Sequence, residues 1–341
     1  MPKNKIWLAA AIPFAILIAL YFGYRHWHSA ETVSGREELL TRMPEDASAV
    51  AYLDLAQLRS SPFLLQLFRM APQPEPDGDY AQFLQATGFN YERDLDRLAL
   101  AINRQTQNST AFAVAEGRFD RKKIEAYGAR FASLKTADGK ALYSIPMSRS
   151  SRKVFFKFLR DDRIAWANDS SYFFQQPRGA TSTEWGEHFS RLAGTPIFAV
   201  LRQDSGTVAA LSQAPGGLHS PQLAALLAQL QWISISGRPE GNLLHVAIEG
   251  ESVTEGTVHQ LKELLRGLVV LAQMGLNDPK TRKQLDPEVR QGYLELLQSA
   301  DIQQVDRGTS KSLRVLLEVT PKLLQAAQMP SAGADAAKPG R

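Results

Sequence analysis

The chain of 341 residues contains no cysteine. It can therefore form no disulfide bond, no thiolate metal site and no cysteine nucleophile, and it has no cysteine to carry a lipid anchor. Charged residues are scarce at 22% while hydrophobic residues make up 44%, a balance that excludes a mainly disordered chain. A chain of this length and composition is sufficient for one large domain or two ordinary ones.

Acidic residues are absent from the first 30 positions, which contain the basic residues Lys3, Lys5 and Arg25. The nineteen residues from Ile6 to Tyr24 carry no charge. As a helix they would measure roughly 28 Å, close to the hydrocarbon thickness of a bilayer. A cleaved secretory signal is the alternative, but His28-Ser29-Ala30 places a bulky side chain where a cleavage site needs a small one. We therefore predict an uncleaved signal anchor.

Aromatic residues lie at both ends of this segment, where their rings favour the headgroup level of a membrane, and a proline lies within it, which a membrane span tolerates. The basic residues and the terminal amine before the segment outweigh Arg25 after it, which predicts a cytoplasmic N-terminus. The protein is then expected in the inner membrane of a bacterium, with the rest of the chain in the periplasm. We assign these residues to the membrane anchor: Ile6, Trp7, Pro13, Tyr21, Tyr24 and Trp27.

Charge is unevenly distributed over the rest of the chain. Residues 31–117 carry 7 basic and 13 acidic side chains, whereas residues 118–163 carry 13 basic and 5 acidic ones. The two stretches have net charges of −6 and +8, so internal pairing between them is the favoured interpretation. The alternative is a surface for an anionic partner, such as lipid headgroups or an acidic protein. Its candidate residues are Arg149, Arg152, Lys153, Lys157, Arg160 and Arg163.

An order of predicted elements occurs twice in the body of the chain. Two apolar runs flank a polar turn and are followed by Glu116-Gly117 and a helical stretch, and the same order recurs about 133 residues later around Glu249-Gly250. Each half then has a strand and helix before this unit and a hairpin after it, which predicts an internal duplication. The predicted strands are 48–55, 98–102, 110–115, 154–159 and 164–168 in the first half, and 196–202, 232–236, 243–248, 301–306 and 313–319 in the second.

Alternation along these strands predicts the fold class. Leu244, Val246 and Ile248 alternate with polar or small residues, which is typical of antiparallel sheets with one covered face. The long helical stretch 254–276 has an apolar stripe suited to packing on such a sheet. We predict an α+β fold with helices on one face. The expected organisation is an anchor over residues 1–29, a stalk over 30–43, a first half over 44–178, a second half over 184–328 and a disordered tail over 329–341.

The segment Met43-Pro44-Glu45-Asp46-Ala47, which leads into the predicted strand 50–54, and Thr87-Gly88-Phe89-Asn90 further on resemble a group of uncharacterised bacterial cell-envelope proteins. In that group a membrane anchor precedes duplicated α+β halves, a domain of unknown function, and Met43 stands where the group usually has leucine. The resemblance implies the same topology here. It implies no catalytic residue, cofactor or activity.

Motifs for known chemistries are missing from the sequence, including the nucleophile elbow, the zinc-protease motif and the phosphate-binding glycine loops. Glu184, Glu187 and His188 could share a helical face and bind a cation, but a solvated helix start is the favoured interpretation. Asp161-Asp162 between two arginines is interpreted as a hairpin turn rather than an acid/base pair.

These observations predict a non-enzymatic, single-pass membrane protein whose periplasmic body is a binding or assembly component of the bacterial envelope. No catalytic residue, cofactor or metal ligand is assigned. A protein partner in the envelope is expected, nucleic acid is not, and a small-molecule ligand is left undefined. The alternatives are a lipid or lipophilic-ligand binding protein and, less favoured, an unrecognised envelope hydrolase.

Overall fold

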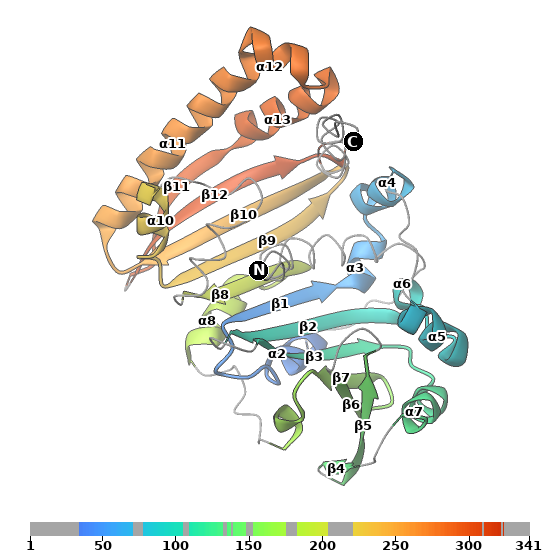
Figure 1. The fold of residues 1–341 in the computed structure, drawn as a ribbon. Helices are drawn as coiled ribbons and strands as arrows, with labels where there is room; N and C mark the ends of the chain where they lie inside the picture. The colour runs from blue at the N-terminus through green and yellow to red at the C-terminus, as the bar shows by residue number, and fades with distance from the viewer. Residues whose placement is uncertain are drawn as a thin grey trace, which may run out of the picture.

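A computed structural model describes residues 34–70, 78–104, 109–131, 135–137, 139–147, 153–174, 183–203, 221–308, 310–321 and 323. Its centre is a twelve-stranded sheet in which every neighbouring pair is antiparallel (Figure 1). The strands follow the order β11-β12-β10-β9-β8-β1-β2-β3-β7-β6-β5-β4. The predicted α+β class is confirmed in this form, as a large antiparallel sheet with helices. The predicted anchor, its six assigned residues and the predicted tail lie outside the described residues.

The first part of the described chain contains seven strands. Helices α2 (Ser34–Leu40), α3 (Leu55–Arg59), α4 (Pro62–Met70), α5 (Gly78–Thr87), α6 (Tyr91–Asp94) and α7 (Arg121–Ala129) lie between or before them, followed by the short helix η1 (Ser170–Phe173). The strands are β1 (Ala49–Asp54), β2 (Leu95–Arg104), β3 (Ser109–Gly117), β4 (Lys135–Ala137), β5 (Lys140–Pro146), β6 (Lys153–Arg160) and β7 (Arg163–Ala167).

The second part begins with helix α8 (Thr183–Arg191). Its strands are β8 (Ile197–Arg202), β9 (Trp232–Glu240), β10 (Leu243–Ser252), β11 (Asp301–Asp306) and β12 (Lys311–Val319). Its other helices are α10 (Pro221–Leu227), α11 (Glu255–Asn277), α12 (Pro279–Gln284) and α13 (Pro287–Ser299). Each strand predicted from the sequence coincides with one of the observed strands, whereas the hairpin of β4 and β5 was not predicted.

Strands β1 and β8 pair at the middle of the sheet, with Val50 opposite Val200 and Tyr52 opposite Phe198. Outward from this pair the order is the same on both sides: β1-β2-β3-β7-β6 on one and β8-β9-β10-β12-β11 on the other. Helix α2 precedes β1 as α8 precedes β8. The sheet therefore has matching arrangements on either side of its central pair.

Helices cover both faces of the central strands, which differs from the expectation of helices on one face. Ala199 and Leu201 of β8 pack toward α10 and α11, while Phe198 and Val200 pack in a cluster with residues of α2 and α8. Leu53 of β1 packs toward α3 and α4, on the same face as α11. The sequence expectation came from the alternation in the strands observed as β9 and β10. Strand β8 is instead apolar and buried from Ile197 to Leu201, because both of its faces are covered there.

The predicted stalk over residues 30–43 is corrected by helix α2. Leu39, Leu40 and Met43 are fully or nearly fully buried in the core beneath it. Burial of these apolar side chains stabilises the packing of the segment on the sheet, although the segment also carries charged residues. The chain from Ser34 onward therefore belongs to the folded body.

The longest described helix, α11, has an exposed apolar strip. Val270, Leu271 and Met274 are more than half exposed on its outer side, while Val258 and Leu261 at its start are buried against the sheet. Within the part of the chain that the structure describes, no helix combines the length and the apolar character needed to cross a membrane.

Candidate functional site

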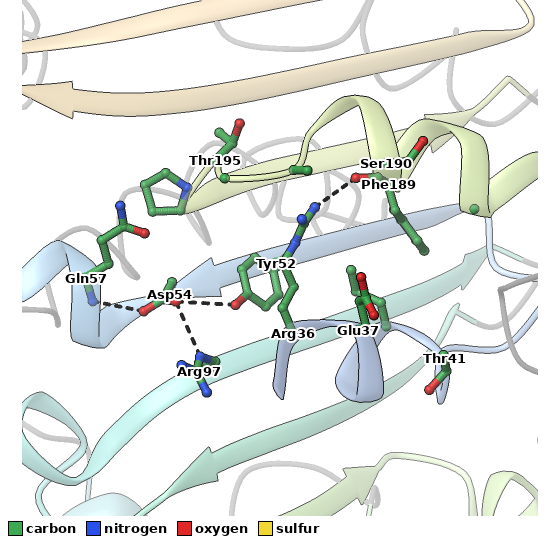
Figure 2. A pocket seen from close by; sticks show the side chains of 15 residues that line it. Arg36, Glu37, Thr41, Tyr52, Asp54, Gln57, Arg97, Phe189, Ser190 and Thr195 are labelled. Carbon is green, nitrogen blue, oxygen red and sulfur yellow. Dashed lines mark hydrogen bonds and ion pairs between the residues drawn. The ribbon is translucent and has the colours of Figure 1, made fainter. Parts of the chain in front are cut away.

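A cleft of about 510 Å³ lies between α2 and α8, over the central strands of the sheet. Its floor is formed by Tyr52 and Asp54 of β1 and by Arg97 of β2 (Figure 2). One wall comes from α2 and the other from the end of α8 and the turn that follows it. The wall residues are Arg36, Glu37, Leu40 and Thr41 on one side and Gly186, Phe189, Ser190, Ala193, Gly194, Thr195 and Pro196 on the other, with Gln57 at one end.

The two walls are held in place by buried apolar side chains. Leu39 and Leu40 anchor α2 to the sheet, and Trp185 and Phe189 anchor α8. The indole Nε1 of Trp185 donates to the carbonyl oxygen of Glu45 at 3.2 Å. Because α2 and α8 hold the same place relative to β1 and β8, the cleft lies where the two matching arrangements meet.

Arg36 extends across the middle of the cleft (Figure 2). Its guanidinium lies over the rings of Tyr52 and Phe198, with centroid distances of 5.6 and 5.1 Å, and Nη2 donates to the carbonyl oxygen of Phe189 at 2.9 Å. Burial lowers the pKa of Arg36, an effect that Tyr52 and Glu37 oppose. Among the described residues no carboxylate forms an ion pair with Arg36, and its Nε is buried without an acceptor there.

Charged side chains form a row across four strands beside the cleft. Arg97 Nε lies 3.3 Å from Asp54 Oδ2 and its Nη1 lies 2.5 Å from Glu116 Oε1. Glu116 also accepts from Arg163, which in turn contacts Glu38 of α2. Burial disfavours the charge of Arg97, but Asp54 and Glu116 outweigh it and raise its pKa. Each of these ions therefore has an opposite charge beside it.

Gly35 allows α2 to lie close to this row. A methyl group added at Gly35 would lie 2.5 Å from Nη1 of Arg97, so a larger residue would displace the arginine or the helix. Glu38, one turn further along α2, contacts Arg160 at 3.0 Å as well as Arg163, and the hydrogen bond from Arg163 lowers the pKa of Glu38. The first turn of α2 is thus fixed by contacts with charged residues of the sheet.

The predicted basic patch is not a single exposed surface over its described members. Arg160 and Arg163 pair with Glu38, and Arg163 is buried. Lys157 is only 6% exposed and lies 5.6 Å from the ring centroid of Phe173. Lys153 is exposed at the start of β6. Arg149 and Arg152 lie outside the described residues. The contacts of Arg160 and Arg163 with Glu38 agree with internal pairing, which was the favoured interpretation of the charge distribution.

The other weak candidates from the sequence have structural contacts. His188 Nδ1 lies 3.3 Å from Glu251 Oε1, and Arg191 contacts the same carboxylate, so α8 is attached to β10 there. Asp161 lies in the turn between β6 and β7 and pairs with Arg121 at 3.0 Å. Over the ranges described, His, Asp and Glu side chains nowhere gather in threes as a metal site requires.

The second half carries a counterpart of the Glu116 contacts. Glu249 accepts hydrogen bonds from Arg307 and Arg314 at 2.7 to 2.9 Å. Arg314 of β12 lies directly opposite Glu249 of β10, as Arg163 of β7 lies opposite Glu116 of β3. The two Glu-Gly pairs recognised in the sequence thus place equivalent carboxylates beside equivalent arginines.

Sequence reasoning missed the cleft because it assigned Arg36 to the stalk. A signal for the helix was present: Ser34 and Glu37 have the spacing of a capping box and precede Leu39-Leu40. The approach of α8 and the row of charges depend on strands that are distant in the sequence, and no local pattern indicates them.

Comparison with known proteins identifies no family. No family model matches the chain, and no curated protein matches it. Three crystal forms (IV, III and I) of a protein called TP0453 are similar in structure, with TM-scores of 0.41, 0.40 and 0.40 and sequence identities of 7%, 10% and 8%. The alignments cover 84–88% of this chain and 95–97% of that one. A likeness at this level indicates neither a family nor a function.

Proposed function

We propose that this protein is a non-enzymatic ligand-binding component of the bacterial envelope, and that the cleft between α2 and α8 is its binding site. The observation that carries the proposal is the cleft itself. Its volume of about 510 Å³ is in the range of small-molecule sites, and it combines apolar walls with a few charged groups. The matching arrangements that meet at the cleft support the further proposal that the two halves arose by duplication.

The chemistry of the lining supports binding over hydrolysis. Asp54 accepts from Arg97 and from the backbone N–H of Gln57, so its carboxylate already has donors. The hydroxyls of Thr41 and Ser190 donate to carbonyl oxygens three residues earlier in the chain, those of Glu38 and Glu187. A hydroxyl used in this way is not paired with a base that would activate it.

The location proposed for the protein rests on the sequence. Residues 6–24 would hold the chain in the inner membrane and place the body in the periplasm. Only nine residues separate Tyr24 from Ser34, the first residue of α2. Nine extended residues span at most about 32 Å, so the cleft would lie close to the membrane surface. This position is consistent with a ligand that comes from the membrane or the periplasm.

A lipophilic-ligand protein is the second candidate. The apolar walls contributed by Leu40, Phe189 and Pro196 favour it. The cleft also has Arg36 and Arg97 with Glu37 and Asp54, and an entirely apolar ligand would leave these charges without compensation. An amphipathic ligand satisfies both features.

Binding is tested by filling the cleft. Ala193 is exposed on the wall after α8, so Ala193→Phe should occupy the cleft without disturbing the core. The matched control is Ala272→Phe on the exposed side of α11. Full-length protein is purified from envelope membranes, and retained small molecules are identified by native mass spectrometry. We expect a ligand in the wild type and the control and none in Ala193→Phe. A wild type without ligand, or equal ligand in Ala193→Phe, would contradict the proposal.

The proposed topology has a separate test. A reporter enzyme that works only outside the cytoplasm is fused after Lys338 of the full chain. We expect activity from this fusion, and we expect it to stay with the membrane fraction. An inactive, cytoplasmic fusion would contradict the orientation, and release into the soluble periplasm would contradict the uncleaved anchor.

A further inference from the structure

Arg36 differs from other arginines near it because it has no ion pair with a carboxylate of the described residues. Arg97 contacts Asp54 and Glu116, and Arg163 contacts Glu38 and Glu116. Within the described ranges, the guanidinium of Arg36 has the carbonyl of Phe189 as an acceptor but no carboxylate within 4 Å. A half-buried cation without an ion-pair contact is unfavourable, because burial removes part of its hydration. Glu37, the next residue in the chain, opposes the lowering of the Arg36 pKa by burial but forms no ion pair with it, so the guanidinium is open to direct contact with a bound anion.

The position of Arg36 makes an anion site accessible from the cleft. Its guanidinium lies near the rings of Tyr52 and Phe198, and it extends into the cleft from α2 (Figure 2). Nη2 donates to the carbonyl oxygen of Phe189 and Nε is buried, so among the described contacts Nη1 is the nitrogen left for a ligand. A guanidinium N–H donates a charge-assisted hydrogen bond to a carboxylate oxygen.

The other groups of the cleft limit the anion to a single charge. Arg97 and Asp54 pair with each other, which leaves Arg36 and Glu37 as the remaining charges of the lining. A dianion such as a phosphate monoester would bring two negative charges to one guanidinium beside Glu37. A monoanion would balance Arg36 with less repulsion.

Apolar groups lie next to the arginine on both walls. Leu40 belongs to α2, and Phe189, Ala193 and Pro196 belong to α8 and the turn after it. A ligand whose charged end contacts Arg36 would therefore place the rest of its surface against apolar side chains. Burial of that surface would supply the main favourable contribution to binding.

We propose that the cleft binds a monocarboxylate joined to a small apolar body, with the carboxylate on Arg36 and the apolar body against Leu40, Phe189 and Ala193. This inference rests on the proposed ligand-binding function and names its ligand class. A medium-chain fatty acid and the C-terminal carboxylate of a short apolar peptide share this chemistry. The experiment includes both sources.

The test measures binding to the full-length protein in detergent by calorimetry. The probes are octanoate, octan-1-ol, octyl phosphate, N-acetyl-Leu-Leu with a free carboxylate, and the amide of the same peptide. We expect at least one carboxylate probe to bind about tenfold more tightly than its uncharged counterpart. The tighter of the two carboxylates identifies the source. The inference would be overturned if neither carboxylate bound more tightly than its uncharged counterpart. It would also be overturned if octyl phosphate bound more tightly than both carboxylates.

Substitutions locate the site. Arg36→Gln should weaken carboxylate binding about tenfold and leave octan-1-ol unchanged, while Arg266→Gln on exposed α11 is the control. Glu37→Gln should strengthen carboxylate binding about two- to threefold, since it removes a neighbouring negative charge. Glu37 is exposed, so this variant remains informative if Arg36→Gln does not fold. Equal carboxylate affinity in Arg36→Gln and wild type, or no gain in Glu37→Gln, would overturn the inference.

Failure of the ligand class is distinguishable from failure of the binding function. If octan-1-ol binds as tightly as octanoate and Ala193→Phe blocks it, the cleft is a binding site for an uncharged ligand and the carboxylate inference is wrong. If Ala193→Phe changes the binding of no probe, the cleft is not the site and both proposals are wrong.

Discussion

Glu249 shows how a single carboxylate connects distant parts of this fold. Arg307 and Arg314 are 58 and 65 residues from it in the chain, and both donate to it. Burial disfavours the charged carboxylate, but the hydrogen bonds from the two arginines outweigh burial and lower the pKa of Glu249 below its ordinary value of 4.5. The charged form is therefore the one that stabilises the folded protein.

Replacing Glu249 by glutamine should destabilise the protein in a pH-dependent way. At pH 7 we expect a loss of about 1–3 kcal/mol in the free energy of unfolding, because two arginines lose their anion. The folded-state pKa lies below the unfolded-state value, so the stabilisation is present above about pH 4.5 and is lost as the pH falls through the folded-state pKa. The difference in the free energy of unfolding between the wild type and Glu249→Gln should therefore diminish as the pH falls toward 3. Urea denaturation over this pH range measures it.

Glu263→Gln is the matched control for this substitution. Glu263 pairs with Arg266 at 3.5 Å on the surface of α11, where both side chains are 54% exposed. Such a pair contributes at most about 1 kcal/mol, so the control should change stability little at any pH. Equal stability of Glu249→Gln and the wild type at pH 7 would show that the arginine contacts do not stabilise the fold.

At the residue scale, the sequence showed part of this arrangement. The recurrence of Glu-Gly at positions 116 and 249 was visible as a pattern. The arginine partners were not, because Arg163 and Arg314 become neighbours only when β7 pairs with β3 and β12 with β10. Arg163 was instead grouped with nearby basic residues as a candidate surface patch.

Among the elements, α11 should tolerate substitution on its outer side. A methyl group added at Gly267 would meet no atom within 4 Å of the described structure, and glycine is unfavourable in the middle of a helix. We expect Gly267→Ala to raise the free energy of unfolding by about 1 kcal/mol. Thermal and urea denaturation measure the change.

Gly117→Ala provides the contrast at the end of β3. A methyl group there would overlap the backbone oxygen of Asp94, which cannot move aside as a flexible side chain can. We expect a loss of roughly 2 kcal/mol or more. A destabilised Gly267→Ala variant would indicate that the outer side of α11 is covered in the folded protein.

At the element scale, prediction succeeded where a local pattern was long. The helix predicted over 254–276 is observed as α11 over Glu255–Asn277. Helices α12 and α13 were not predicted, although each begins with an Asp-Pro pair in which the aspartate caps the helix, at Asp278 and Asp286. Strands β4 and β5 were missed because they are short or have no clear alternation.

For the whole molecule, the continuity of the sheet predicts that the two halves depend on each other. Strand β8 pairs with β1, and Tyr52 stacks on Phe198 across this junction with a centroid distance of 5.3 Å. A fragment of residues 184–328 would expose β8 as an unpaired edge with apolar faces. We expect this fragment to aggregate or lack stable structure, while residues 34–341 unfold in one cooperative transition. Calorimetry and hydrogen exchange measure both.

A monomeric fragment 184–328 with its own cooperative transition would contradict this prediction and would make the predicted halves independent domains. The pairing of β1 with β8 could not be predicted from a local sequence pattern, because it joins segments about 148 residues apart and its register depends on packing from both faces. The order of elements in each half could be predicted, whereas the junction between the halves, and with it the cleft, could not.

The two ends of the sheet bear on how the protein avoids self-association. Strand β11 is the described end on one side, and most of its side chains are exposed and polar, including Asp301, Gln303 and Asp306. At the other end, β4 has three residues. Unpaired backbone groups on a long apolar edge would recruit strands from other copies and promote aggregation. Here the long apolar strands lie at the centre of the sheet, and the described end strands are polar or short. Strands of other copies therefore find little apolar edge with which to pair, although the sheet is large.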